Sequence, residues 1–413
     1  MSNPQTDELT RALRERSDDM SGTGPSLDDV KGRARGIQRR RRAASGLAVA
    51  AVALAIAVPM GTQLDGLNRG QQPPVATQAP SPTTDASGPV EPQVPVEVEV
   101  EAAAAPRGEG PAILYADGTT LHRPDGSELE LPAQYTYLLP YADGVMGFNG
   151  GEGERGTTTI VDGQGNPVEG PWDGLTGAIS SDGQSVATVL HATGGVDLQL
   201  RPRAGADPDE GWTSNVVAFD GEVDLAGFVG PDSVAYDLTV FGDKGGKSTP
   251  YVTDWSSEPR ELTSVIDLRA ANDVTGVVAG MSTMDFRRNE YCFAVVKAAT
   301  DSVVWDTCEY RLDTFSPDGS SVIGVDPQTD GLGGSTATML DATNGDVMRE
   351  FTVPDGFIND IQWESDSTAL AAVMQDGTWN LLRLRTDGTV EQVLDPTKNG
   401  YEDSSPWRFQ ITP

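Results

Sequence analysis

Phe315-Ser316-Pro317-Asp318-Gly319, followed by Val322-Ile323-Gly324-Val325, is the stretch of sequence that decides the fold. A Ser-Pro-Asp-Gly segment before β-branched residues predicts a tight turn that leads into a strand. The arrangement recurs along the chain. Its copies are Ser181-Asp182-Gly183, Gly230-Pro231-Asp232 and Ser365-Asp366-Ser367, with weaker ones at Ala142-Asp143-Gly144 and Asn272-Asp273.

A second family of turns lies out of phase with the first. Its members are Pro124-Asp125-Gly126, Gly163-Gln164-Gly165, Ala204-Gly205, Trp255-Ser256, Thr300-Asp301, Asn344-Gly345 and Asp387-Gly388. From Asp125 to Asp387 the chain makes six steps of about 44 residues each. Two hairpin turns per repeat of this length are typical of a four-stranded propeller blade. The sequence therefore predicts an all-β, seven-bladed propeller over residues 111–413.

The two ends of this region are expected to share one blade. The segment from Ile113 to Leu131 would supply three strands, and the run Trp407-Arg408-Phe409-Gln410-Ile411 would supply the fourth. Closing the ring in this way removes exposed sheet edges, which otherwise invite aggregation.

The Ser-Pro-Asp-Gly turn at 316–319 resembles the turns of TolB-like and WD-repeat propellers. The Gly-His and Trp-Asp pairs of WD repeats are missing, apart from Trp305-Asp306. The whole layout resembles a group of actinobacterial membrane-anchored propeller proteins, some of whose N-terminal tails resemble anti-sigma factors. This chain lacks the His-x-x-x-Cys-x-x-Cys pattern of the zinc-binding type.

Ahead of the propeller, Arg39-Arg40-Arg41-Arg42 precedes eighteen uncharged residues, 43–60. A helix of that length spans about 27 Å, close to the hydrocarbon thickness of a bilayer. The arginines predict a cytoplasmic tail at 1–42, a transmembrane helix at 43–60 and an extracytoplasmic remainder. Eight prolines predict a disordered linker over 61–110. The alternative is a cleaved export signal, for which Ala55-Ile56-Ala57 offers a cleavage site and the arginines a twin-arginine motif.

Charge excludes some classes of partner. The formal net charge is −33, and residues 43–413 alone hold 19 basic and 55 acidic residues. Such a polyanion repels nucleic acid and anionic lipid, so we expect no nucleic-acid partner.

Two cysteines, Cys292 and Cys308, lie close together on the predicted outer side of the membrane. Two cysteines in an oxidising compartment predict one disulfide. If the hairpin between the flanking strands centres on Thr300, the two cysteines face each other.

No motif in the sequence predicts catalysis or a bound cofactor. The only histidines, His122 and His191, fall in or beside predicted strands, where a histidine is usually structural. Gly242–Ser248 resembles a phosphate loop, but Phe241 replaces its first glycine and a strand-like run follows. Asp326–Gly331 and Asp207–Glu210 place carboxylates in loops that suit calcium, although neither follows the helix-loop-helix calcium pattern. No metal or cofactor site is assigned.

We therefore expect a single-pass membrane protein whose extracytoplasmic propeller acts by binding a protein or cell-wall ligand rather than by catalysis. Its tail is a candidate for binding a cytoplasmic regulator such as a sigma factor. The alternative is a propeller hydrolase or lyase that uses carboxylates on the central channel. Acidic clusters facing the channel would favour the enzyme, whereas an apolar or aromatic face would favour partner binding.

Overall fold

A computed structural model of the chain describes residues 96–149, 156–174, 176–192, 195–202, 213–217, 221–242, 245–328, 333–398 and 405–410. The chain divides into two compact units, Met1–Ser87 and Gly88–Pro413, and every described residue belongs to the second. The predicted tail, the apolar segment 43–60 and the linker up to residue 95 lie outside the described residues. Among those that are described, no helix is long and apolar enough to cross a membrane.

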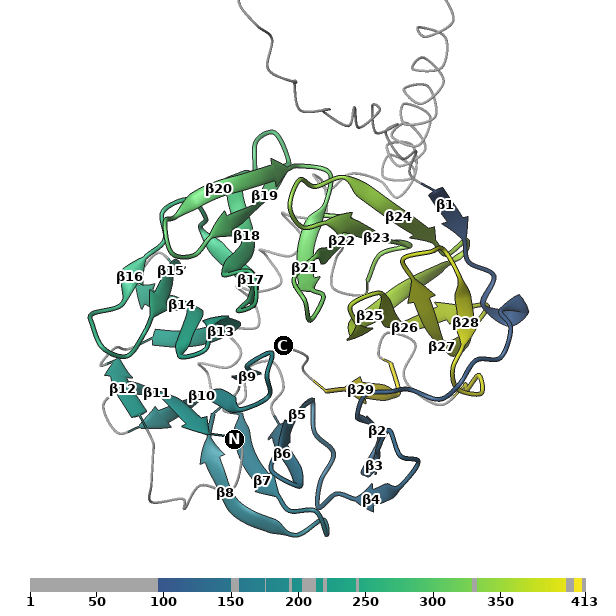
Figure 1. Cartoon of the computed structure of the whole chain (residues 1–413), viewed down its shortest axis with the longest axis horizontal. Coiled ribbons are helices and arrows are strands. Elements are labelled where there is room, and N and C mark those ends of the chain that lie inside the picture. The colour runs from purple at the N-terminus through teal and green to yellow at the C-terminus, as the bar shows by residue number, and fades with distance from the viewer. Residues whose placement is uncertain are drawn as a thin grey trace, which may run out of the picture. The chain divides into compact units, whose positions relative to one another are not determined.

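The described strands form seven antiparallel sheets arranged as blades around a centre (Figure 1). From the centre outward, blade one is β29 (Trp407–Phe409), β2 (Tyr115–Asp117), β3 (Thr120–His122) and β4 (Glu128–Glu130). Blade two is β5 (Tyr137–Tyr141), β6 (Gly144–Asn149), β7 (Thr157–Val161) and β8 (Pro167–Asp173). Blade three is β9 (Thr176–Ile179), β10 (Ser185–Ala192), β11 (Gly195–Pro202) and β12 (Thr213–Val217).

The remaining blades follow the same order. Blade four is β13 (Gly221–Gly230), β14 (Ser233–Gly242), β15 (Gly245–Thr253) and β16 (Arg260–Glu261). Blade five is β17 (Asp267–Asn272), β18 (Val277–Asp285), β19 (Glu290–Lys297) and β20 (Ser302–Thr307). Blade six is β21 (Arg311–Phe315), β22 (Ser321–Val325), β23 (Thr336–Asp341) and β24 (Val347–Thr352). Blade seven is β25 (Gly356–Ser365), β26 (Thr368–Gln375), β27 (Thr378–Arg385) and β28 (Val390–Gln392). The all-β, seven-bladed prediction is confirmed.

The ring closes as predicted, through the C-terminal strand. β29 is the innermost strand of blade one and pairs with β2, Phe409 opposite Tyr115 and Trp407 opposite Asp117. Trp407 and Phe409 are both buried. The chain therefore joins its own ends in one sheet, and no innermost strand is left unpaired among the seven blades.

Both families of predicted turns lie between strands. The Ser-Pro-Asp-Gly family joins the first strand of a blade to the second, and the other family joins the third strand to the fourth. At the best copy, Asp318 Oδ1 accepts hydrogen bonds from Ser316 Oγ at 2.7 Å and the Ser320 amide at 3.0 Å. Gly319 has a φ of +70°, which a residue with a side chain rarely adopts. This chemistry explains why the turn was recognisable from sequence.

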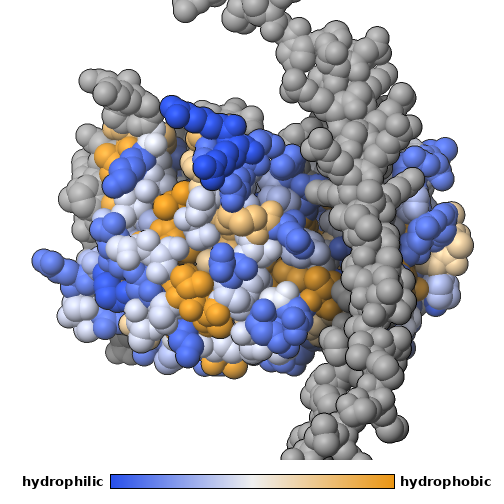
Figure 2. Space-filling model, turned by 90° about the horizontal axis from the view of Figure 1, so that it is seen from above, coloured by the Kyte–Doolittle hydropathy of each residue, from blue (hydrophilic) through white to orange (hydrophobic). Residues whose placement is uncertain are grey.

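The core is formed where the apolar faces of neighbouring blades pack against each other. Trp363 of blade seven is buried, and its indole Nε1 donates to the Thr314 carbonyl of blade six at 3.1 Å. Trp305 of blade five likewise donates to the Ala342 carbonyl of blade six at 2.8 Å. Figure 2 views the molecule from the rim, where hydrophilic side chains surround small apolar patches. These two tryptophans thus fix blades five and seven against blade six.

Residues 96–112, here called the N-terminal strap, correct one expectation. The predicted linker reached residue 110, but β1 (Val96–Glu99) pairs in parallel with β24, and a 3-10 helix η1 (Ala102–Ala104) follows. Val100 and Ala102 are buried in the core between blades six and seven. The alternating residues Val98 and Val100 give this segment one apolar side, and burial of that side turns a linker-like sequence into a fifth strand.

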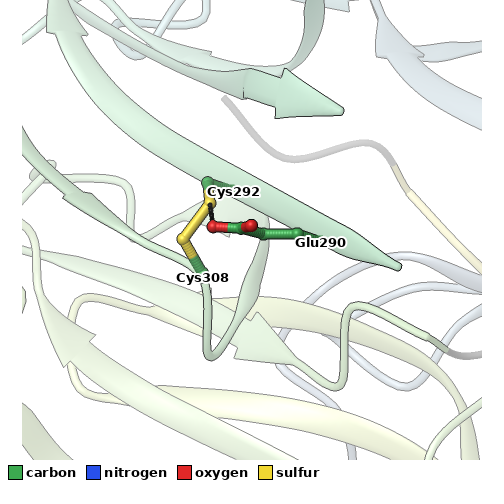
Figure 3. A group of neighbouring side chains, drawn as sticks. All are labelled: Glu290, Cys292 and Cys308. Atoms are coloured by element: carbon green, nitrogen blue, oxygen red, sulfur yellow. Dashed lines mark hydrogen bonds between the residues drawn. A yellow bond between two sulfur atoms is a disulfide. The ribbon is translucent and has the colours of Figure 1, made fainter. Parts of the chain in front are cut away.

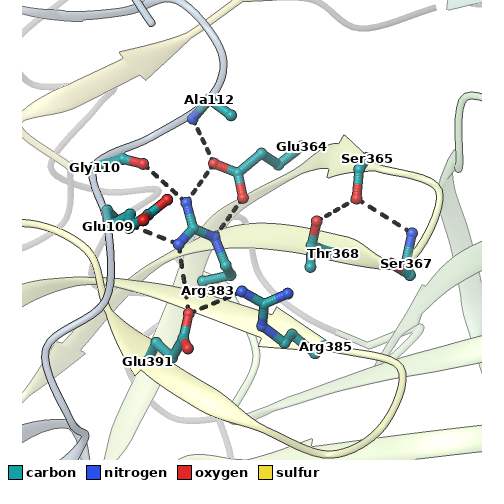
Figure 4. Close-up of polar contacts among 10 residues, drawn as sticks. All are labelled: Glu109, Gly110, Ala112, Glu364, Ser365, Ser367, Thr368, Arg383, Arg385 and Glu391. Carbon is teal, nitrogen blue, oxygen red and sulfur yellow. Dashed lines mark hydrogen bonds and ion pairs between the residues drawn. The ribbon is translucent and has the colours of Figure 1, made fainter. Parts of the chain in front are cut away.

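The strap ends on a buried ion pair in blade seven (Figure 4). The side chains of Arg383 and Glu364 are only 6% and 4% exposed and bind each other through two contacts. Arg383 also donates to the carbonyls of Glu109 at 3.2 Å and Gly110 at 2.9 Å. Glu364 Oε1 accepts the Ala112 amide at 2.6 Å. The pair therefore satisfies strap backbone groups and fixes the strap to the propeller.

Candidate ligand-binding channel

The innermost strands of all seven blades enclose a cavity of about 490 Å³ at the centre of the ring. Its described lining is Tyr137, Thr176, Gly177, Ala178, Ile179, Asp224, Leu225, Ala226, Gly227, Arg269, Ala270, Ala271, Asp313, Thr314, Asp360, Gln362, Phe409 and Gln410. Most of these residues are small or polar, which leaves room in the lumen and offers hydrogen-bonding groups to a ligand. A cavity of this size falls in the range of small-ligand sites.

Three carboxylates and one guanidinium are the charged groups of this described lining. Asp224 lies on β13, Arg269 on β17, Asp313 on β21 and Asp360 on β25. Arg269 is already engaged, because its Nη2 lies 2.6 Å from Asp267 Oδ2. The described lining therefore holds more carboxylates than cations, and the nearby cations outside it are Arg311, whose Nε lies 3.8 Å from Asp313 Oδ1, and Arg408, which acts on Asp360.

The electrostatics of the lining follow from burial and from like charges. Burial, and after it the nearby Asp313 carboxylate, raises the pKa of Asp360 to about 6, although Arg408 opposes this shift. Asp224 is exposed, but it is partly desolvated by the channel wall, which raises its pKa, with Glu222 and Asp267 adding to the effect. Each raised pKa means that ionising the carboxyl group is unfavourable in the ligand-free channel. A bound cation would lower both pKa values.

Behind the channel wall, Asp237 of β14 is buried at 4% exposure. Burial raises its pKa to about 7, and the neighbouring Asp267 adds to the rise. The Leu268 amide opposes it by donating to Asp237 Oδ2 at 2.6 Å. Asp237 and Asp224 are paired across β14 and β13. A second carboxylate therefore lies directly behind the channel carboxylate of Asp224.

The histidines take no part in the described channel lining. His122 of β3 stacks on Tyr115 with ring centroids 4.5 Å apart, and its Nδ1 lies 3.4 Å from Glu128 Oε1. These contacts fix it within blade one. His191 belongs to β10, in a part of the strand whose side chains are outside the described set.

The two other motifs singled out from the sequence occupy loops. Gly242 pairs with Gly245 at the end of the β14–β15 hairpin, so a strand, not a helix, follows the phosphate-loop-like stretch. In Asp326–Gly331, Asp326 Oδ1 accepts the Gln328 amide at 2.9 Å, and residues 329–331 lie outside the described ones, as does 207–210.

The predicted disulfide between Cys292 and Cys308 is present in the structure (Figure 3). β19 and β20 pair with Phe293 opposite Thr307, which brings the two cysteines opposite each other at the next step. An extra residue, Val304, bulges from β20. Without that bulge the register would shift by one residue and Cys308 would point to the other side of the sheet.

Glu290 lies beside this disulfide, its Oε1 3.9 Å from Cys292 Sγ (Figure 3). Among the described residues these three side chains form a cluster whose potential metal-ligand atoms lie within 4.8 Å of one another. Both sulfurs are bonded to each other, so neither offers the thiolate that a metal would bind. The cluster is therefore structural.

The chain was compared with known proteins. No family model matches it, and no curated protein matches it either. Distant structural likeness links it to TolB from Acinetobacter baumannii, with 16% identity, a TM-score of 0.38 and coverage of 77% of this chain and 88% of that chain.

Two further solved structures show the same level of likeness. The Cps50 (Swd1) β-propeller domain of Myceliophteria thermophila has 11% identity, a TM-score of 0.41, and coverage of 66% of this chain and 88% of that chain. Hydrazine synthase of Kuenenia stuttgartiensis has 11% identity and a TM-score of 0.44, over 70% of this chain and 95% of that chain. These likenesses concern architecture alone.

Proposed function

We propose that this protein is an extracytoplasmic binding module whose channel captures a cationic group, an amine or guanidinium, of a protein or cell-wall ligand. The observation that carries the proposal is the set of Asp224, Asp313 and Asp360 around a cavity of about 490 Å³. The one cation of the described lining, Arg269, is already paired to Asp267, and Arg311 approaches Asp313 only to 3.8 Å. A cationic group placed among these carboxylates removes their mutual repulsion and gains charge-assisted hydrogen bonds.

Titration of tetralysine into the full chain by calorimetry tests this proposal. We expect Asp313→Asn/Asp360→Asn to weaken binding by at least about tenfold, because each change removes a negatively charged partner of the bound amine. The matched control is Asp306→Asn/Asp376→Asn, which removes the same charge from exposed positions. Equal weakening by both double variants would show that only the overall charge attracts the peptide.

The location rests on other observations. The apolar segment 43–60 after four arginines supports a single-pass anchor with its N-terminus in the cytoplasm, and the disulfide suits an oxidising compartment. A reporter active only outside the cell, fused after Pro413, should work while the chain stays in membranes at full length. A soluble product starting near Val58 would instead identify a cleaved signal.

A signalling role for the tail is part of the same proposal. The tail 1–42 carries Leu9 and Leu13 at helical spacing, which supports binding to a cytoplasmic regulator such as a sigma factor. Leu9→Asp/Leu13→Asp would remove this apolar side while leaving the anchor intact. If the variant retains every cytoplasmic partner of the wild type in pull-downs, the tail serves only as an anchor flank.

A hydrolase or lyase is the second candidate, because the acidic channel lining is the feature expected above to favour an enzyme, and the pKa of one of its carboxylates supports it further. Asp360, with a pKa of about 6, lies close enough to Asp313 for the two carboxylates to interact. Two carboxyl groups with separated pKa values are what acid–base catalysis uses. Turnover of chromogenic glycosides that is lost in both Asp313→Asn and Asp360→Asn would favour this candidate over simple binding.

A further inference from the structure

Two neighbouring blades carry hairpins whose tips expose large apolar side chains. We call these hairpins, β14–β15 at residues 239–247 and β18–β19 at residues 283–291, the aromatic fingers. Phe241 is 55% exposed on the first finger and Phe286 is 72% exposed on the second. Val240 and Met284 beside them are each 44% exposed. Burying such side chains elsewhere would be favourable, so their exposure indicates a contact surface.

The two fingers emerge on the same face of the propeller. Each joins the second strand of its blade to the third, and strands alternate in direction, so both tips lie opposite the Ser-Pro-Asp-Gly turns. The fingers also extend past the innermost strands. β18 and β19 still pair at Asp285 and Glu290, whereas β17 begins opposite Met281. The tips therefore project from the face instead of lining a groove.

The second finger is held in shape by its own contacts. Phe286 meets Tyr291 edge-to-face with ring centroids 6.3 Å apart. Asp285 Oδ1 accepts the Arg287 amide at 2.9 Å, which closes the turn. At its base, the bond between Cys292 and Cys308 joins β19 to the end of β20. A rigid finger loses little conformational entropy when it docks.

The tips carry exposed cationic side chains in a chain of net charge −33, with Asp285 and Glu290 beside the arginines of the second finger. Arg287-Arg288 is the only pair of adjacent basic residues after residue 42. Both arginines are exposed, although Arg288 Nε lies 3.6 Å from Asp285 Oδ2, and Lys247 is exposed on the first finger. Aromatic side chains flanked by arginine and lysine on a convex tip are suited to a lipid–water interface, where rings enter the acyl boundary and cations meet phosphates.

We propose that the two aromatic fingers dock the propeller on the surface of a lipid bilayer. Phe241, Met284 and Phe286 would enter the interfacial region, while Arg287 and Arg288 contact lipid phosphates. The acidic remainder of the propeller restricts this contact to the tips. Residues 61–95 would span about 110 Å when extended at ~3.1 Å per residue, so a chain anchored at 43–60 keeps the fingers within reach of the same membrane.

Hydrogen exchange of the full chain, measured by mass spectrometry with and without vesicles, tests the proposal. The vesicles contain phosphatidylcholine and phosphatidylglycerol at roughly 7:3, which gives an anionic surface. We expect peptides covering 239–247 and 283–291 to exchange about tenfold more slowly with vesicles present. The β26–β27 hairpin is the internal control, because its tip lies on the same face and carries Asp376 instead of an aromatic ring.

Two variants separate the apolar and the cationic contributions. Met284→Ser/Phe286→Ser and Arg287→Gln/Arg288→Gln should each remove most of the slowing in the second finger, with exchange elsewhere unchanged. Unchanged exchange of both wild-type fingers on adding vesicles would overturn the proposal, and so would equal slowing of the control hairpin. Neither result depends on what the channel binds, so failure here leaves the tetralysine test of the proposed function intact.

Discussion

At the scale of single residues, the channel holds carboxylates that the stability of the fold does not require. Asp224, Asp313 and Asp360 lie on the innermost strands of three blades and face one cavity, and the pKa values of Asp224 and Asp360 are raised. Stability is lost whenever a carboxylate ionises in such surroundings. Carboxylates with raised pKa values that converge on one cavity are candidates for a binding or catalytic site.

Asp237 gives a direct test of this residue-scale account. Its folded-state pKa of about 7 lies above its usual 3.8, so its contribution to stability is present at low pH and lost as pH rises through about 7. Asp237→Asn should therefore stabilise the protein relative to wild type by on the order of 2 kcal/mol more near pH 8 than near pH 5. Urea unfolding at both pH values measures this difference. A constant difference between the two proteins would contradict the assignment.

The channel carboxylates were not found from the sequence, although the two families of turns were. Turns have local chemistry, such as the Ser316–Asp318 bond, that is readable in a few residues. The channel brings together residues from strands scattered over the whole propeller, and the chain has 62 Asp and Glu residues to choose from. A charged residue in the first strand of a predicted blade, such as Asp313 just before Phe315, was the available signal.

At the scale of elements, the strap and the cysteine hairpin show how register decides contacts. The sequence predicted that Cys292 and Cys308 face each other, and the bulge at Val304 makes this true. A bulge has no reliable signature in one sequence. The strap was expected to be linker, because its Val-Glu alternation is too short to show whether a sheet edge is available to pair with it.

Removing one partner of the buried ion pair that holds the strap should cost more stability than removing both partners. Arg383→Met leaves Glu364 buried without its partner, and we expect a loss of about 3–5 kcal/mol in the free energy of unfolding. Arg383→Met/Glu364→Leu should recover more than half of that loss, because no uncompensated charge remains. Arg385→Met is the control, since its partner pair is partly exposed and worth at most about 1 kcal/mol. Equal stability of the single and double variants would contradict this reading of the pair.

At the scale of the whole molecule, one strand closes the ring. Deleting residues 405–413 would remove β29, expose the edge of β2 and empty the sites of Trp407 and Phe409. We expect several kcal/mol of destabilisation, since each buried aromatic residue lost costs about 3–5 kcal/mol. Differential scanning calorimetry of the truncated chain measures it. Melting at the full-length temperature would mean that the ring does not depend on this closure.

The central claim is that the channel of this propeller captures a cationic group. Its most direct test is the affinity of the full chain for tetralysine between about pH 5 and pH 7.5. Because Asp360 has a pKa of about 6, it ionises across this range, while the lysine amines stay charged. Wild-type affinity should rise by about tenfold with pH, as one charged partner is gained. The rise should be largely absent in Asp360→Asn. An equal rise in both proteins would contradict the claim.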